Sequence, residues 1–234
     1  MSKELFREDA YLKECEARVE AQEENRVALE QTVFYPVGGG QPGDQGVLIR
    51  SNGDEIRVLD TLKERNSGRI WHIVEEGASF QPGEQVRARI DWERRYMLMR
   101  LHSCMHMLCA VVPAPVTGGS IRDAGSARLD FDLPEPPDKQ ALNEQLNSLT
   151  TADHPMQLRW ISDDELRAQP ELVRTMSVQP PMGAGRVRLV EFEGVDLQPC
   201  GGTHVANSRE IGEVVIQSIK KKGKQNRRIT VALA

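Results

Sequence analysis

Residues 91–113 read DWERRYMLMRLHSCMHMLCAVVP and predict one long amphipathic helix. Asp91 is a residue type that caps a helix N-terminus, and Pro113 and Pro115 end the helical pattern. The apolar residues recur at intervals of three and four, which is the period of an α-helix; they are Leu98, Leu101, Met105, Leu108 and Val112. The sequence changes character at this helix, which therefore separates two regions.

Residues 1–90 contain short β-like runs separated by turn residues such as Asn52-Gly53 and Pro82-Gly83. Several short strands at nearly regular spacing are typical of a β-barrel or a β-sandwich. We therefore predict a small N-terminal β domain over residues 1–90. The expected strands are residues 26–35, 46–49, 55–59, 69–74 and 85–90.

Residues 91–234 mix helical and strand patterns without a strict βαβ alternation, which is typical of an α+β domain. Beyond the first helix, a second contains Leu142, Leu146 and Leu149. A third is expected to start where Ser162 and Glu165 form a capping-box signature. The expected strands are residues 127–133, 156–161 and 187–192, and a hairpin of 213–219 with 228–233.

The composition excludes several classes of protein. Hydrophobic residues make up 39% of the chain, which indicates a folded globular protein and not a disordered one. The longest apolar run, residues 107–112, is far shorter than the roughly 20 residues that span a membrane. The N-terminus lacks the apolar core of a secretory signal. We expect a cytoplasmic protein whose four cysteines are reduced.

Two pairs of potential metal ligands share a four-residue spacing. His102 and His106 project from one face of the long helix. Far along the chain, Cys200 and His204 flank the segment Gly-Gly-Thr, whose glycines permit a tight backbone. Three imidazoles and one thiolate suit a tetrahedral zinc ion. The sequence therefore predicts a Zn²⁺ site with these four ligands.

The spacing leaves open whether this metal is structural or catalytic. Four protein ligands are typical of a structural site, whereas a catalytic site keeps an exchangeable position. The metalloprotease pattern HExxH is excluded because Ser103 follows the first histidine. Ligands about 100 residues apart favour a catalytic cleft over a local structural clip. We expect His72 on a strand surface and His154 in a turn, both outside the site.

Residues 36–46, PVGGGQPGDQG, form a glycine-rich segment. Such a loop can bind an anion through its backbone N–H groups, and it can equally be a tight turn. It is not a Walker A loop, because no Gly-Lys-Ser/Thr follows, and it is not the GxGxxG pattern that opens a helix.

A basic cluster lies near the C-terminus of a chain whose net charge is −5. Clusters of this kind bind nucleic-acid phosphates, and they also occur as solvated turns. Six positions around Gly223 are therefore candidates for contacts with nucleic-acid phosphates: Lys220, Lys221, Lys222, Lys224, Arg227 and Arg228.

Three of these segments together resemble a known family. FYPVGGGQPGDQG (34–46), RLHSCMHML (100–108) and CGGTHV (200–205) are similar to the editing domain of alanyl-tRNA synthetases. They are also similar to its free-standing relatives, the AlaX-type trans-editing proteins, and the resemblance implies an independent deacylase and not a synthetase. The segments occur in the family's order, and the likeness spans nearly the whole chain. The resemblance implies an N-terminal β-barrel followed by a zinc-binding α+β editing domain.

The resemblance also implies an aminoacyl-tRNA deacylase that acts on misacylated tRNA(Ala). A site that hydrogen-bonds a hydroxyl can reject a substrate without one, which favours Ser-tRNA(Ala) as the principal substrate. Gly-tRNA(Ala), which has no hydroxyl, is a second candidate that this argument does not explain. The family's zinc ligands correspond to the four residues named above. Ser103 stands where the family often has threonine, so the hydroxyl is retained but the shape of the pocket is in doubt. We expect Gln41, Thr203 and Ser103 to act on water or substrate, and the loop residues Gly39, Gly40 and Asp44 to border the pocket.

Two alternatives to this function stay open at the level of the sequence. One is a non-enzymatic RNA-binding module in which zinc has a structural role. The other is a zinc hydrolase of other aminoacyl-tRNAs or of small esters.

Overall fold

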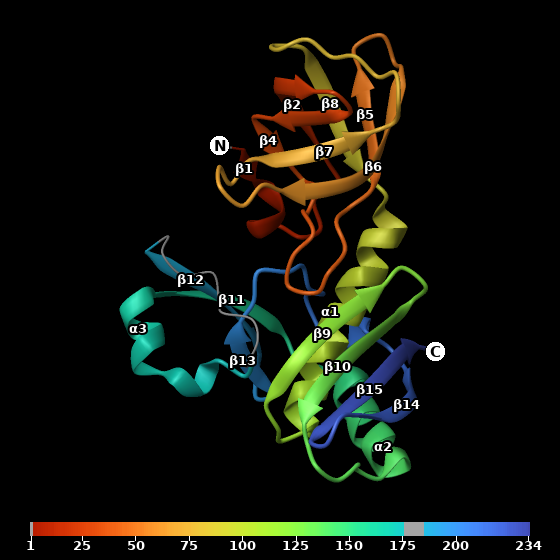
Figure 1. Cartoon of the computed structure of the whole chain (residues 1–234), viewed down its shortest axis with the longest axis vertical. Coiled ribbons are helices and arrows are strands. Elements are labelled where there is room, and N and C mark those ends of the chain that lie inside the picture. Colours follow the sequence, from red (N-terminus) through yellow and green to blue (C-terminus); the bar gives the residue numbers. More distant parts are fainter. Residues whose placement is uncertain (1, 176–184) are drawn as a thin grey trace. The chain divides into compact units, whose positions relative to one another are not determined.

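The computed structural model describes residues 2–175 and 185–234. The chain divides into two compact units, and most of their helices and strands are labelled in Figure 1. The first unit comprises Met1–Gly38 and Pro42–Met97, and the second comprises Gly39–Gln41 and Leu98–Ala234. The separate folding of residues 1–90 and 91–234 stays a prediction.

The first unit contains a closed six-stranded barrel in the order β2-β3-β7-β6-β5-β8. All neighbouring strands are antiparallel. Alternate side chains of each strand point inward and form the barrel core. The prediction of a β domain is confirmed, and the architecture is a barrel. The strands are β2 (Glu14–Glu23), β3 (Arg26–Leu29), β5 (Gly46–Arg50), β6 (Glu55–Lys63), β7 (Ile70–Val74) and β8 (Gln85–Ile90).

The main differences from the sequence prediction concern β2 and the expected strand 26–35, and β6 also extends beyond the expected 55–59. The sequence does not predict β2, because glutamates occupy most of its outward positions. The expected strand 26–35 instead ends at Leu29 and is followed by the short β4 (Gln31–Thr32), which pairs in parallel with β1 (Lys3–Glu4). A short 3₁₀ helix, η1 (Leu5–Arg7), follows β1.

His72 lies inside the barrel unit, so its predicted surface position is wrong. Its Nδ1–H donates to the carbonyl oxygen of Val27 at 3.0 Å, and its Nε2 accepts from the Thr32 hydroxyl at 2.8 Å. Thr32 Oγ1 in turn accepts from the backbone N–H of Phe34 at 3.0 Å. Burial lowers the pKa of His72 to about 4, so the ring is neutral at pH 7. These hydrogen bonds satisfy both ring nitrogens without exposing them.

The second unit contains most of helix α1 (Trp92–Val111) and two antiparallel sheets. One sheet has the order β14-β15-β10-β9 and the other the order β11-β12-β13. This mixture confirms the α+β class. The strands are β9 (Val116–Arg122), β10 (Ser126–Asp132), β11 (Met156–Ser162), β12 (Arg186–Phe192), β13 (Asp196–Pro199), β14 (Val214–Lys222) and β15 (Asn226–Leu233). The other helices are α2 (Lys139–Thr150), α3 (Asp163–Ala168), η2 (Pro170–Leu172) and η3 (Ser208–Glu210).

Local signals position the helices as the sequence predicts. Asp138 caps α2 by accepting from the backbone N–H of Ala141 at 2.8 Å, and the predicted capping box of Ser162 and Glu165 starts α3. β9 and β13 are not predicted, because β9 contains two glycines and β13 has only four residues. No helix in the described part of the chain is both long and apolar enough to cross a membrane.

Candidate metal centre

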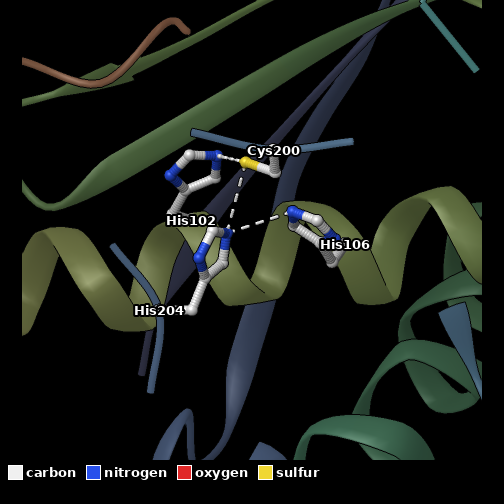
Figure 2. Close-up of side chains that lie close together, drawn as sticks. All are labelled: His102, His106, Cys200 and His204. Atoms are coloured by element: carbon white, nitrogen blue, oxygen red, sulfur yellow. Dashed lines mark hydrogen bonds between the residues drawn. The ribbon is translucent and has the colours of Figure 1, made fainter. Parts of the chain in front are cut away.

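Four side chains of the second unit converge on one point, as Figure 2 shows. His102 and His106 belong to α1, and Cys200 and His204 belong to the loop that follows β13. One potential ligand atom of each residue lies within 4.8 Å of the others. The three histidines are buried, and Cys200 is partly exposed. The structure therefore brings together the two pairs that the sequence spacing singled out.

Three of the distances between donor atoms in this cluster are close to those between the ligands of a tetrahedral zinc ion. Cys200 Sγ lies 3.5 Å from His102 Nε2 and 3.6 Å from His204 Nε2. His204 Nε2 lies 3.1 Å from His106 Nε2. Zinc bonds of about 2.0–2.1 Å to nitrogen and about 2.3 Å to sulfur give tetrahedral edges of roughly 3.3–3.6 Å. The types of donor atom and these three distances therefore fit a zinc ion.

Two features hold the Cys200 loop close to α1. A Cβ atom at Gly202 would overlap the His102 ring, so the loop can approach the helix only with glycine at this position. Arg188 on β12 is buried, and its Nη1–H groups donate to the carbonyl oxygens of Cys200 at 3.0 Å and Gly202 at 2.8 Å. The sheet and the helix therefore jointly fix the loop that carries two of the four donor atoms.

Gln41 connects His102 to Thr203. Its Oε1 accepts from His102 Nδ1–H at 2.8 Å and from the backbone N–H of Thr203 at 3.2 Å. Its Nε2–H donates to Thr203 Oγ1 at 2.8 Å. Both Gln41 and Thr203 are buried. Gln41 therefore orients the His102 ring with Nε2 toward the cluster, and the Thr203 hydroxyl keeps its own proton to donate.

Asp196 on β13 orients His106 in the same way. Its Oδ2 accepts from His106 Nδ1–H at 2.8 Å and from Gln198 Nε2–H at 2.8 Å. A carboxylate on the second ring nitrogen fixes the tautomer of a metal-binding histidine and raises its basicity. Asp196 is not predicted from the sequence, because the four-residue strand β13 that carries it is too short to show a period.

The electrostatics of the cluster favour binding of a cation. Burial opposes ionisation of Cys200, but the His102 and His204 rings hold the pKa of its thiol well below the usual range. Burial lowers the pKa of His204 to about 3, which keeps its ring neutral. Burial also lowers the pKa of His106, but the hydrogen bond to Asp196 and the Cys200 sulfur raise it to about 9. The low pKa of Cys200 favours the thiolate, which is the form of cysteine that binds a metal ion.

Two other predicted site residues of the second unit, Ser103 and Gly40, form hydrogen bonds with backbone N–H groups. Ser103 is buried, and its hydroxyl accepts from the backbone N–H of Val205 at 3.1 Å. Gly39 and Gly40 are exposed and have positive φ angles of 56° and 79°. The carbonyl oxygen of Gly40 accepts from Ile121 N–H at 2.8 Å, which holds the residue before Gln41 against β9. Direct action of Ser103 on the substrate stays a prediction.

Asp44, which the sequence places at the pocket, is an anchor of the glycine-rich segment within the first unit. Its buried carboxylate forms an ion pair with the buried Arg95 and accepts from the backbone N–H of Tyr35 at 2.6 Å. Its carbonyl oxygen accepts from the Thr61 hydroxyl at 2.9 Å. These contacts hold Asp44 against Tyr35, Thr61 and Arg95.

The basic cluster lies on the β14–β15 hairpin, and its members differ in their surroundings. Four lysines are exposed: Lys220, Lys221, Lys222 and Lys224. Arg227 is buried and donates to the carbonyl oxygen of Pro134. Arg228 donates to both carboxylate oxygens of Asp130 at 2.7 and 2.6 Å. The lysines are therefore better placed than the arginines to meet phosphate.

Two family models match parts of the chain. Residues 187–230 match the threonyl and alanyl tRNA synthetase second additional domain, and these residues include Cys200 and His204. Residues 6–94 match the model described as tRNA synthetases class II (A). The two matches fall on different parts of the chain, the second of them on the barrel.

Known proteins are similar to the chain over nearly all of its length. The chain is 38% identical over 244 residues to the alanyl-tRNA editing protein AlaX-M of Methanosarcina barkeri, covering 100% of this chain and 99% of the relative. It is 35% identical over 233 residues to AlaX-M of Saccharolobus solfataricus, covering 98% of both. It is also 32% identical over 232 residues to the alanine–tRNA ligase of Sulfurisphaera tokodaii, covering 94% of this chain and 25% of the ligase. The chain therefore belongs to the AlaX-M family of alanyl-tRNA editing proteins.

Proposed function

We propose that this chain is a zinc-dependent deacylase that removes wrong amino acids from tRNA(Ala) in the cytoplasm. Its AlaX-M relatives are named as alanyl-tRNA editing proteins and match it over their whole length. The observation that carries the proposal is the convergence of three imidazoles and one thiolate, from His102, His106, Cys200 and His204.

The proposed reaction is hydrolysis of the ester between the amino acid and the terminal ribose of the tRNA. A water oxygen attacks the carbonyl carbon, the bond from that carbon to the ribose oxygen breaks, and the ribose oxygen takes up a proton. The products are the free amino acid and uncharged tRNA. A zinc ion held by the four ligands would polarise the ester carbonyl and lower the pKa of a water molecule.

The surrounding residues position these groups. Gln41 and Asp196 accept from the Nδ1–H groups of His102 and His106, which leaves both Nε2 atoms for the metal. Thr203 accepts from Gln41, so its hydroxyl proton is available to an oxygen of the substrate. Backbone N–H groups of the two glycine-rich loops stabilise the negative charge that develops on the ester oxygen.

The ligand set is tested with the Cys200→Ala variant. This variant is expected to lose bound zinc, measured by metal analysis, and to hydrolyse Ser-tRNA(Ala) about 100-fold more slowly or worse. The matched control is Cys104→Ala, which removes a buried free thiol outside the cluster and is expected to keep zinc and activity. Full activity in a zinc-free Cys200→Ala protein would contradict the proposal.

Chelation of the wild-type protein separates a catalytic metal from a structural one. A catalytic zinc predicts that the chelated protein keeps its circular dichroism spectrum and loses deacylation. Unfolding on chelation would instead support the alternative of a structural zinc.

Ser-tRNA(Ala) is the proposed principal substrate, and the Thr203 hydroxyl is the proposed partner of the seryl hydroxyl. A site that hydrogen-bonds a hydroxyl can reject an analogue without one by roughly 10⁴- to 10⁵-fold. Thr203→Val is expected to reduce the preference for Ser-tRNA(Ala) over Ala-tRNA(Ala), whereas Thr203→Ser is expected to keep it. Gly-tRNA(Ala) is the second proposed substrate. Its glycyl group has no hydroxyl, so its rate of hydrolysis is the reference for a substrate that cannot make this hydrogen bond. Equal wild-type rates on the seryl and alanyl esters would rule out recognition of the hydroxyl.

A further inference from the structure

One face of the β11–β12–β13 sheet leads from the metal cluster to the protein surface. Side chains alternate along a strand, and residues paired across strands share a face. Asp196 and Gln198 of β13, which both contact His106, lie on this face. Val190 of β12 is the cross-strand partner of Gln198, and Arg188, two residues earlier on the same strand, lies on the same face. Trp160 of β11 lies on this face too, because it is paired with Arg188.

Trp160 lies two strands away from the metal ligand Cys200. It is paired with Arg188, whose carbonyl oxygen accepts from the backbone N–H of Cys200 at 3.2 Å. Neighbouring strands are about 4.8 Å apart, so about 10 Å separates the two backbones. Side-chain exposure rises along this path, from 4% for Arg188 to 45% for Trp160. Trp160 is therefore an accessible group on the same face as the buried site.

A cation lies over the ring of this tryptophan. The guanidinium carbon of Arg186 is 4.6 Å from the Trp160 ring centroid, and Arg186 is exposed. Exposed aromatic rings and guanidinium planes are the groups on which unpaired nucleobases stack. Arginine also attracts the phosphates that accompany such bases. The chemistry of this pair therefore fits a single-stranded nucleotide.

We propose that Trp160 and Arg186 form a stacking platform for the terminal nucleobase at the unpaired 3′ end of the tRNA. This inference rests on the proposed function, in which the scissile ester lies on the ribose of that same nucleotide. The separation between the strands of Trp160 and Cys200 is comparable to the span of one nucleoside. A base on the platform therefore places its ribose ester toward the metal cluster.

Kinetics of the Trp160→Ala variant test the platform. Loss of one base stack is expected to raise KM for Ser-tRNA(Ala) about tenfold, while kcat and bound zinc stay unchanged. Trp160→Phe keeps an aromatic ring and is expected to recover most of the affinity. The control is Val215→Ala, which truncates another exposed apolar side chain of the second unit. A wild-type KM in Trp160→Ala overturns the platform.

A second measurement does not depend on deacylation. Adenosine 5′-monophosphate is expected to quench tryptophan fluorescence of the wild-type protein saturably, and ribose 5-phosphate is not. The quenching is expected to vanish in Trp160→Phe, which lacks this fluorophore. Absence of quenching, equal quenching by ribose 5-phosphate, or persistence in Trp160→Phe each overturns the platform. If quenching depends on Trp160 but the wild-type protein does not hydrolyse Ser-tRNA(Ala), the nucleobase site stands and the proposed function fails.

Discussion

The three histidines of the cluster differ in the hydrogen-bond partner of Nδ1, the ring nitrogen that does not face the cluster. His106 donates to a carboxylate of Asp196, and His102 donates to the amide oxygen of Gln41. Nδ1 of His204 has no hydrogen-bond partner in the described part of the chain. Because a hydrogen bond to an ionised group is roughly twice as strong as a neutral one, His106 is the histidine whose ring is held most firmly.

Asp196→Asn is expected to weaken zinc binding about 10- to 100-fold, because the neutral amide no longer raises the basicity of His106. A competition titration with a chromophoric chelator measures the affinity directly. Asp130→Asn is the matched control, because it neutralises another aspartate in a hydrogen-bonded ion pair, the one with Arg228. An unchanged zinc affinity in Asp196→Asn would show that the carboxylate does not support the metal site.

The β14–β15 hairpin carries exposed lysines near its turn and an arginine that is paired within the sheet. Lys221, Lys222 and Lys224 are exposed near the turn, whereas Arg228 on β15 pairs with Asp130 on β10. The pKa of Asp130 is lowered, first of all by its hydrogen bond from Arg228, so the pair is ionised at pH 7. The basic run therefore contains exposed lysines, which are available to a ligand, and an arginine whose charge is paired within the sheet.

Replacing Lys221, Lys222 and Lys224 with glutamine is expected to weaken tRNA binding. The slope of log affinity against log salt concentration should also become shallower, by about one for each phosphate that the lysines no longer neutralise. Filter binding at several salt concentrations measures both quantities. Arg228→Gln is expected to lower the stability of the protein and leave the slope unchanged. An unaltered slope in the triple variant would mean that other residues bind the phosphates.

Helices and strands were predicted correctly where a periodic pattern of apolar residues continues over many consecutive residues. α1 and the β14–β15 hairpin lie where the periodicity predicts them. β13 was not predicted, although it carries Asp196 and leads into Cys200. Four residues are too few to show a period, and this strand exists because it pairs with β12.

At the scale of whole folded units, the buried His72 makes the stability of the barrel depend on pH. Its pKa is about 4 in the folded chain, against 6.5 for the free side chain, because burial disfavours the charged ring. The unfolded chain therefore binds a proton at a higher pH than the folded chain does. The contribution of the neutral ring is complete above pH 6.5 and is lost as the pH falls toward 4.

Over this window the free energy of unfolding is expected to fall by about 3 kcal/mol on account of His72, at about 1.4 kcal/mol per pKa unit. Urea unfolding at several pH values between 7 and 4 measures the loss. His72→Gln keeps a polar side chain that does not titrate, so its stability should vary less with pH than that of the wild type. The same pH dependence in both proteins would mean that other groups cause it.

The ligand set and the family could be recognised without coordinates, because a four-residue spacing on a helix or around two glycines is a local property of the chain. The hydrogen bonds that orient those ligands could not be recognised in this way. Gln41 is 61 positions from His102, and Asp196 is 90 positions from His106. The face that connects Trp160 to Cys200 likewise depends on the register between strands. Contacts of this kind arise from packing and strand pairing between distant segments, and no local period in a sequence encodes them.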